Sequence, residues 1–148
     1  MPGAPKCISP RRILIVDDNE LGLAARKSVL AELGHVIVTS VHPGTALEIC
    51  SQQNFDLVVT DFRMPGMDGM EFIQHVRAIR PAMPIILLSG FTDALGLTEA
   101  STGADAVIQK SSNEVSHLIR CVNRLLKPVK KPVGSQGAGT ARSKRKVE

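Results

Sequence analysis

The sequence predicts an α/β fold: a doubly wound, five-stranded parallel sheet with helices on both faces. Five short runs of the chain are almost wholly apolar, as strands are when both of their faces are buried. Amphipathic stretches of helical length separate these runs, and this alternation is typical of βα units in a parallel sheet. The 148 residues are 43% hydrophobic and only 3% aromatic. One domain with a substantial, aliphatic core is therefore expected.

The first two βα units occupy residues 12–53. Arg12–Val16 is the first strand, and a helix follows over about residues 20–33, ended by Gly34. The helical period places these side chains on the inner face of that helix: Leu21, Ala24, Ala25, Val29 and Leu30. Val36–Ser40 is the second strand. Pro43 suits the first turn of the next helix, which runs to Gln53.

The third unit begins with a strand over residues 56–60, directly before Asp61. A loop rich in glycine and proline, FRMPGMDG, comes next. Asp68 and Glu71 have the spacing of a capping box, in which each side chain binds the other residue's backbone N–H. They predict a helix start there, with Ile73, Val76 and Ile79 on its apolar face.

The last two units complete the sheet. A strand over 84–88 precedes Ser89 and Gly90, and a shorter helix is expected over 92–101. Ala106–Gln109 is the fifth strand and precedes Lys110. Ser111 and Glu114 form a second capping-box pattern. The helix that follows is ended by Pro128 and has these apolar positions: Val115, Leu118, Ile119, Val122, Leu125 and Leu126.

The domain organisation is predicted as an extension over residues 1–9, one domain over 10–127 and a tail over 128–148. The tail is rich in Pro, Gly, Ser and basic residues and has no hydrophobic period, so disorder is expected. From Lys127 onward seven Lys and Arg face one acid, Glu148, and this segment accounts for the net charge of +4.

Several classes of protein are disfavoured by composition. No run approaches the roughly 20 apolar residues of a membrane span, and the N-terminus lacks the apolar stretch of a secretory signal. The three cysteines are far apart and form neither a metal-ligand pattern nor a disulfide framework. A cytoplasmic location is expected.

The residues that carry chemistry all follow predicted strands. Asp17 and Asp18 follow the first strand, Asp61 the third, Ser89 the fourth and Lys110 the fifth. The carboxyl ends of parallel strands meet at one edge of the sheet, where ligands bind in such folds. Three carboxylates placed together repel one another. A hard cation relieves that repulsion, and Mg²⁺ fits best because it uses few carboxylates and retains waters for phosphate oxygens to replace.

This arrangement indicates phosphoryl transfer. A carboxylate can act as a nucleophile and form an acyl phosphate, and a metal, a lysine and a hydroxyl can share the charge of the phosphoryl oxygens. Asp18 and Asp61 would hold the metal, with Asp17 as a water-mediated partner, while Lys110 and Ser89 would bind phosphoryl oxygens. Taken singly, each residue has an ordinary structural explanation as a cap, a turn residue or a surface lysine. Their order at successive strand ends favours a common site.

Four segments resemble the receiver domains of bacterial two-component response regulators: ILIVDDN (13–19), DLVVTDFRMPGMDGMEF (56–72), PIILLSG (84–90) and GADAVIQK (103–110). The resemblance spans roughly residues 10–127. It implies a flavodoxin-like (βα)5 fold with strand order 2-1-3-4-5, Asp61 as the phosphoacceptor, and Ser89 and Lys110 as its partners. It also implies a Mg²⁺ ion held by Asp17, Asp18, Asp61 and the backbone carbonyl of Arg63.

Two positions depart from the family pattern. Family members often carry Tyr or Phe three residues before the lysine, as a rotameric switch, and here that position is Val107. Many also have a cis proline after the lysine, whereas Ser111 follows Lys110 here. A trans bond is expected, because a cis bond without proline costs about 3 kcal/mol. Neither change removes a reacting group, but both bear on how phosphorylation is read out.

The expected function is that of a stand-alone receiver without an output domain. A sensor histidine kinase or a histidine phosphotransfer protein would phosphorylate Asp61, and the domain would signal to an unidentified downstream protein or pass the group on in a phosphorelay. Self-catalysed phosphorylation and dephosphorylation would be its only catalysis, so it is not expected to be an enzyme.

Two alternatives remain open. The first is a phosphatase or hydrolase that forms an aspartyl-phosphate on a similar scaffold. Such enzymes commonly carry a second Asp two residues after the nucleophile, where this chain has Arg63. The second is a nucleic-acid-binding regulator that acts through the basic tail, which lacks interleaved aromatics and a helix-turn-helix pattern.

Overall fold

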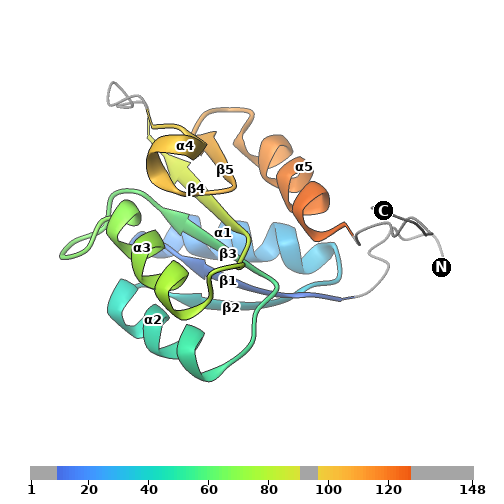
Figure 1. The fold of residues 1–148 in the computed structure, drawn as a ribbon. Coiled ribbons are helices and arrows are strands. Elements are labelled where there is room, and N and C mark those ends of the chain that lie inside the picture. Colours follow the sequence, from blue (N-terminus) through green and yellow to red (C-terminus); the bar gives the residue numbers. More distant parts are fainter. Residues whose placement is uncertain (1–9, 91–96, 128–148) are drawn as a thin grey trace, which may run out of the picture.

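The chain folds around one parallel sheet of five strands in the order β2-β1-β3-β4-β5, as the resemblance implies (Figure 1). The structure is a computed structural model and describes residues 10–90 and 97–127. The strands are β1 (Arg12–Val16), β2 (Val36–Ser40), β3 (Leu57–Asp61), β4 (Ile85–Ser89) and β5 (Ala106–Gln109). The helices are α1 (Glu20–Glu32), α2 (Pro43–Gln52), α3 (Gly69–Ile79), α4 (Glu99–Thr102) and α5 (Glu114–Leu126).

Helices cover both faces of the sheet, because successive strand residues point to opposite sides. Helices α1 and α5 lie on one face, and α2 and α3 lie on the other (Figure 1). In β1, for example, Leu14 and Val16 join the cluster that contains the buried residues of α2 and α3. Ile13 and Ile15 join the cluster of α1 and α5. The central strands are therefore apolar on both faces, as their sequences predict.

The buried face of α1 agrees with the predicted one only in part: Leu30 is buried and Val29 packs half-buried against the core, as predicted. Leu21, Ala24 and Ala25 are exposed, and the exposed fraction of Leu21 reaches 83%. The side chains that α1 buries are Leu23, Arg26 and Leu30. The rest of the prediction failed because Arg26 lies inside the apolar stripe. Its guanidinium is buried against two carboxylates and does not extend into water.

The start of α5 is the second correction. Ser111 and Glu114 do not form the predicted capping box, and Asn113 is the N-cap residue, without a side-chain capping bond. The Ser111 hydroxyl instead accepts a hydrogen bond from the backbone N–H of Asn113 (3.2 Å). The carboxylate of Glu114 binds Arg26 of α1 instead of turning back to its own helix.

Along the rest of α5, Leu118 and two other predicted core residues are buried: Val122 and Leu126. Ile119 and Leu125 are half-buried, whereas Val115 is 47% exposed.

The capping box at α3 forms as predicted. Asp68 accepts from the Glu71 backbone N–H (2.9 Å), and Glu71 accepts from that of Asp68 (3.2 Å). Gly34, which ends α1, has a φ of 101°, a left-handed conformation that glycine adopts without steric cost.

The predicted helix over 92–101 is only partly within the described residues, where α4 covers Glu99–Thr102. Among the helices that the structure describes, none has both the length and the apolar character needed to cross a membrane.

Candidate functional site

Three carboxylates meet at the carboxyl end of the sheet. Asp61 is the last residue of β3, and Asp17 and Asp18 follow β1, which pairs with β3 so that Val16 lies opposite Thr60. One carboxylate oxygen from each of the three residues lies within 4.8 Å of the others. Asp17 and Asp61 are buried, with exposed fractions of 1% and 4%, whereas Asp18 is exposed. The parallel register thus brings together the three acids that the sequence predicts.

Lys110 reaches the cluster from the end of β5. Its ammonium forms an ion pair with Oδ1 of Asp61. Burial raises the pKa of the Asp61 carboxyl, and the charge of Asp17 adds to that rise. Hydrogen bonding and charge attraction from Lys110 lower the same pKa without cancelling the rise. The protein alone therefore stabilises the ionised form of Asp61 less well than water does.

Ser89 ends β4, the strand between those of Asp61 and Lys110. The backbone N–H of Lys110 donates to the Ser89 carbonyl at 2.7 Å, and Asp61 lies opposite Leu88 in the β3–β4 ladder. Ser89 is 2% exposed, and its hydroxyl has a long contact of 3.4 Å to the Gly90 carbonyl. The predicted hydroxyl therefore lies at the end of the strand that separates the predicted nucleophile from the lysine.

Arg63 lies in the loop between β3 and α3. This loop and Asp18 line one open hollow, with the following residues: Asp18, Phe62, Arg63, Met64, Pro65 and Asp68. Gly66 turns the loop with a φ of 86°, and the Gly69 N–H donates to the Phe62 carbonyl at 2.7 Å. Arg63 therefore lines the same hollow as Asp18.

The two departures from the family pattern have clear positions. Val107 is half-buried on β5 and packs against the core cluster of α2 and α3. Its backbone N–H donates to a carboxylate oxygen of Glu99 at 3.1 Å. None of the described residues follows a cis peptide bond, so the bond between Lys110 and Ser111 is trans, as expected.

Sequence reasoning missed Arg26 as a residue of this site. Its guanidinium forms an ion pair with Oδ2 of Asp17 and a second with Glu114, for which Nε and Oε2 are 2.7 Å apart. Burial lowers the pKa of Arg26, but the bonds to Glu114 and Asp17 outweigh it and raise that pKa overall. The available signal was an arginine three residues after Leu23 and four before Leu30, in the stripe that faces the core.

The donor set fits a hard divalent cation. It consists of carboxylate oxygens, and the exposed Asp18 and the open hollow leave room for the waters that Mg²⁺ retains. The raised pKa of Asp61 is consistent with this fit, since a cation would offset the repulsion between Asp61 and Asp17. Asp17, Asp18 and Asp61 are the side chains that could hold the ion.

Comparisons with known proteins agree with the fold. The family model described as the response regulator receiver domain matches residues 13–123. The transcriptional regulatory protein GlrR of Escherichia coli (strain K12) is 31% identical over 93 residues, which are 61% of this chain and 21% of that protein. A protein-glutamate methylesterase/protein-glutamine glutaminase of Dechloromonas aromatica (strain RCB) is 36% identical over 85 residues, covering 56% of this chain and 24% of the relative. The chain thus spans about a fifth to a quarter of the length of these relatives.

Solved structures show the same architecture. The response regulator TrrA of Thermotoga maritima, whose structure is a complex with Mg²⁺-BeF, has a TM-score of 0.71 and 33% identity, and the match covers 78% of this chain and 99% of TrrA. A receiver domain protein of Clostridium thermocellum has a TM-score of 0.72 and 27% identity, with coverage of 78% and 94%. With these likenesses and the family match over residues 13–123, the chain belongs to the response regulator receiver domain family of two-component signalling.

Proposed function

We propose that Asp61 accepts a phosphoryl group from the phosphohistidine of a sensor histidine kinase or a histidine phosphotransfer protein, in a reaction that requires Mg²⁺. One observation carries the proposal. Asp61 is a buried carboxylate that ends a central strand, with Lys110 bound to it and oxygens of Asp17 and Asp18 within 4.8 Å. This combination supplies a nucleophile, a cation for the incoming charge and ligands for a metal.

The proposed reaction transfers a phosphoryl group from the donor histidine to Asp61. An oxygen of Asp61 forms a bond to phosphorus while the phosphorus–nitrogen bond of the donor breaks and its electron pair returns to the imidazole. Lys110 is already placed at Asp61 and would move its ion pair to a phosphoryl oxygen. Ser89, on the adjacent strand end, would donate its hydroxyl to another oxygen. Mg²⁺, held by Asp17, Asp18, Asp61 and the Arg63 carbonyl, would neutralise charge on the transferring group.

The proposed output is protein–protein contact or onward relay, with the domain over residues 10–127 acting as a switch. The rival reading as an aspartyl-phosphate hydrolase needs an acid or base beside the nucleophile. The position two residues after Asp61 carries Arg63, an exposed side chain that has no carboxylate to serve as that acid or base. Residues 128–148, on which the nucleic-acid alternative depends, lie outside the described residues.

The test is intact-mass analysis of the protein after incubation with an acyl phosphate donor, with and without Mg²⁺. We expect one phosphoryl adduct, dependent on Mg²⁺ and absent from Asp61→Asn. Asp56→Asn is the matched control, because Asp56 precedes the same strand at its other end and binds the Arg12 backbone N–H. An adduct that persists in Asp61→Asn would refute the assignment. So would the absence of an adduct when phosphorylated kinases replace the small donor.

A further inference from the structure

Arg26 is a charged residue on the buried face of α1, where the neighbouring positions are aliphatic. Its side chain is only 10% exposed, and Leu23 and Leu30 on the same face belong to the core cluster beneath α1 and α5. A guanidinium is costly to bury unless carboxylates and hydrogen bonds compensate it. Its position therefore depends on its two partners.

Those partners join the acidic site to α5. One is Oδ2 of Asp17, and the other is Oε2 of Glu114, 88 residues away in sequence. The second oxygen of Asp17, Oδ1, accepts the Asn19 backbone N–H at 3.0 Å. Both oxygens of Asp17 thus already have donors, and one of these donors carries a full positive charge.

Gly22 of α1 leaves room for the ion pair between Arg26 and Asp17 because it has no side chain. A Cβ atom added at Gly22 would lie 3.0 Å from Nη1 of Arg26 and 3.4 Å from Oδ2 of Asp17. Any larger residue at this position would press on the guanidinium at the point where it meets the carboxylate. The contact between Arg26 and Asp17 is therefore closely packed from the helix side.

We infer that Arg26 is a positioning residue that competes with the divalent cation for Asp17 and thereby sets the metal affinity of the site, while Glu114 moderates this competition by neutralising Arg26. The inference rests on the metal site of the proposed function. The guanidinium holds Asp17 in place when no metal is bound. When a metal binds, the same positive charge opposes it.

The size of the effect follows from charge and distance. A cation that shares a carboxylate with a guanidinium lies about 5 to 6 Å from it, given ordinary hydrogen-bond and metal–oxygen lengths. Even with the screening of bulk water, a unit charge at that distance weakens the binding of a divalent ion about tenfold. Removal of the Arg26 charge should tighten Mg²⁺ binding by at least that factor. Loss of the Glu114 charge should weaken Mg²⁺ binding by leaving Arg26 less neutralised.

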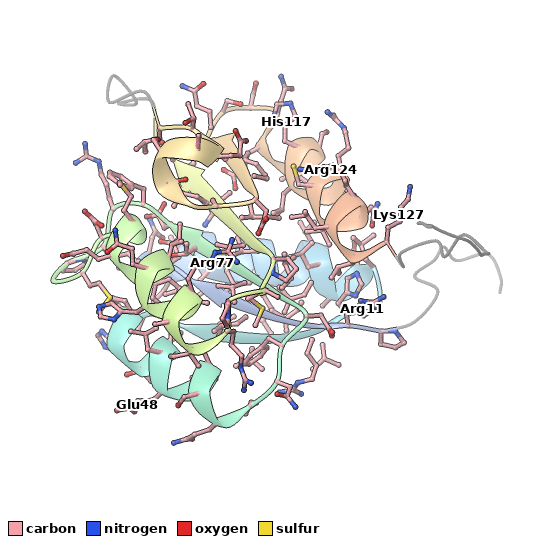
Figure 2. All side chains as sticks on the ribbon, in the orientation of Figure 1. Arg11, Glu48, Arg77, His117, Arg124 and Lys127 are labelled. Carbon is pink, nitrogen blue, oxygen red and sulfur yellow. The ribbon has the colours of Figure 1, made fainter. Side chains whose placement is uncertain are left out.

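Titration calorimetry with Mg²⁺ alone, without phosphodonor, tests the inference on the full chain. Arg26→Met should lower the dissociation constant about tenfold or more. Glu114→Gln retains an acceptor for Nε but loses the charge, and it should raise the dissociation constant. Arg124→Met is the matched control: the same substitution on the exposed surface near the far end of α5 should leave the constant unchanged (Figure 2).

The double variant Arg26→Met/Glu114→Gln shows whether Glu114 acts through Arg26. If it does, Glu114→Gln should have a smaller effect in the Arg26→Met background than in the wild type. An equal effect in both backgrounds would overturn the role given to Glu114. Weaker or unchanged Mg²⁺ binding in Arg26→Met would overturn the competition itself.

If Arg26 did no more than hold Asp17 in place, Arg26→Met would weaken Mg²⁺ binding, because a disordered Asp17 is a poorer ligand. If Arg26→Met fails to fold, the neutral variant Arg26→Gln, which keeps an N–H donor for Asp17, replaces it with the same tightening expected, and unchanged or tighter binding in Glu114→Gln still contradicts the inference. Mg²⁺ binding in the wild type that neither variant alters refutes the inference alone. Absence of Mg²⁺ binding from the wild type and all variants refutes the metal site of the proposed function as well.

Discussion

Gly69, the first residue of α3, lies against the backbone that carries Asp61. A Cβ atom at this position would lie 2.7 Å from the Asp61 carbonyl oxygen and 2.8 Å from Cα of Phe62. The third contact, 2.8 Å to Cδ1 of Leu87, is with a fully buried core side chain. The helix cannot simply retreat, because the Gly69 N–H donates to the Phe62 carbonyl at 2.7 Å. The prediction is that Gly69→Ala destabilises the fold and displaces Asp61.

The magnitude combines two opposing terms. Overpacking of a well-packed site costs about 1–3 kcal/mol, and three contacts under 3.0 Å, two of them with backbone, place Gly69→Ala near the upper end. Alanine recovers up to about 1 kcal/mol of helix propensity over glycine. The net loss is about 2 kcal/mol, which lowers the urea midpoint by about 1 M for a domain of ordinary denaturant sensitivity.

Urea unfolding followed by far-UV circular dichroism measures this loss, since the chain has no Trp or Tyr to report by fluorescence. Gly44→Ala is the matched control. Gly44 lies in the first turn of α2, and a Cβ atom there would meet nothing within 4 Å. That substitution should be neutral or stabilise the fold by about 0.4–1 kcal/mol. Equal midpoints for Gly69→Ala and the wild type would refute the packing argument.

Three further predictions concern charges. Because burial raises the pKa of Asp61, its ionisation destabilises the fold. Without metal, Asp61→Asn should therefore unfold at a higher urea concentration than the wild type at pH 7. The difference should vanish as the pH falls toward about 3.9, the ordinary pKa of an aspartate in an unfolded chain. Burial lowers the pKa of His35, so the fold should lose stability as the pH drops below about 6.5, the ordinary pKa of histidine. Urea midpoints measured above and below that pH should differ less in His35→Gln than in the wild type. Arg77 of α3, labelled in Figure 2, donates to three backbone carbonyls and to Asp105. Arg77→Met should cost about 2 kcal/mol, and an unchanged urea midpoint would contradict this.

Much of the architecture could be predicted from the sequence because the information is local. Each central strand is a short apolar run that ends on a polar residue, and parallel pairing brings those ends to one edge. The predicted acids Asp17, Asp18 and Asp61 therefore meet in the structure, with Lys110 beside them. Strand limits shifted by a single residue, as at β3, which begins at Leu57 rather than Asp56. Such shifts leave the arrangement of the strand ends unchanged.

The inner face of α1 could not be predicted in the same way. Counting apolar residues favours the face of Leu21 and Ala25, whereas the chain buries the face that carries Arg26. The free energy that decides between them comes partly from Asp17 and Glu114, which lie on other elements. A pattern restricted to one helix contains no information about such partners, so an arginine in the apolar stripe is treated as a surface residue.

The two capping-box patterns show how a partner elsewhere in the fold can change the outcome of similar local patterns. Asp68 and Glu71 satisfy each other, and the box forms. The pattern at Ser111 and Glu114 has the same spacing, yet Glu114 binds Arg26 instead. A charge-assisted bond to a buried guanidinium is stronger than a bond to one exposed backbone N–H, which favours Arg26 as the partner of Glu114. Helix α5 begins at Glu114, with Asn113 as its N-cap residue and no side-chain capping bond. The first residue of α5 therefore shares Arg26 with Asp17. A change of charge at Asp17 or at Glu114 should alter how strongly Arg26 binds the other carboxylate.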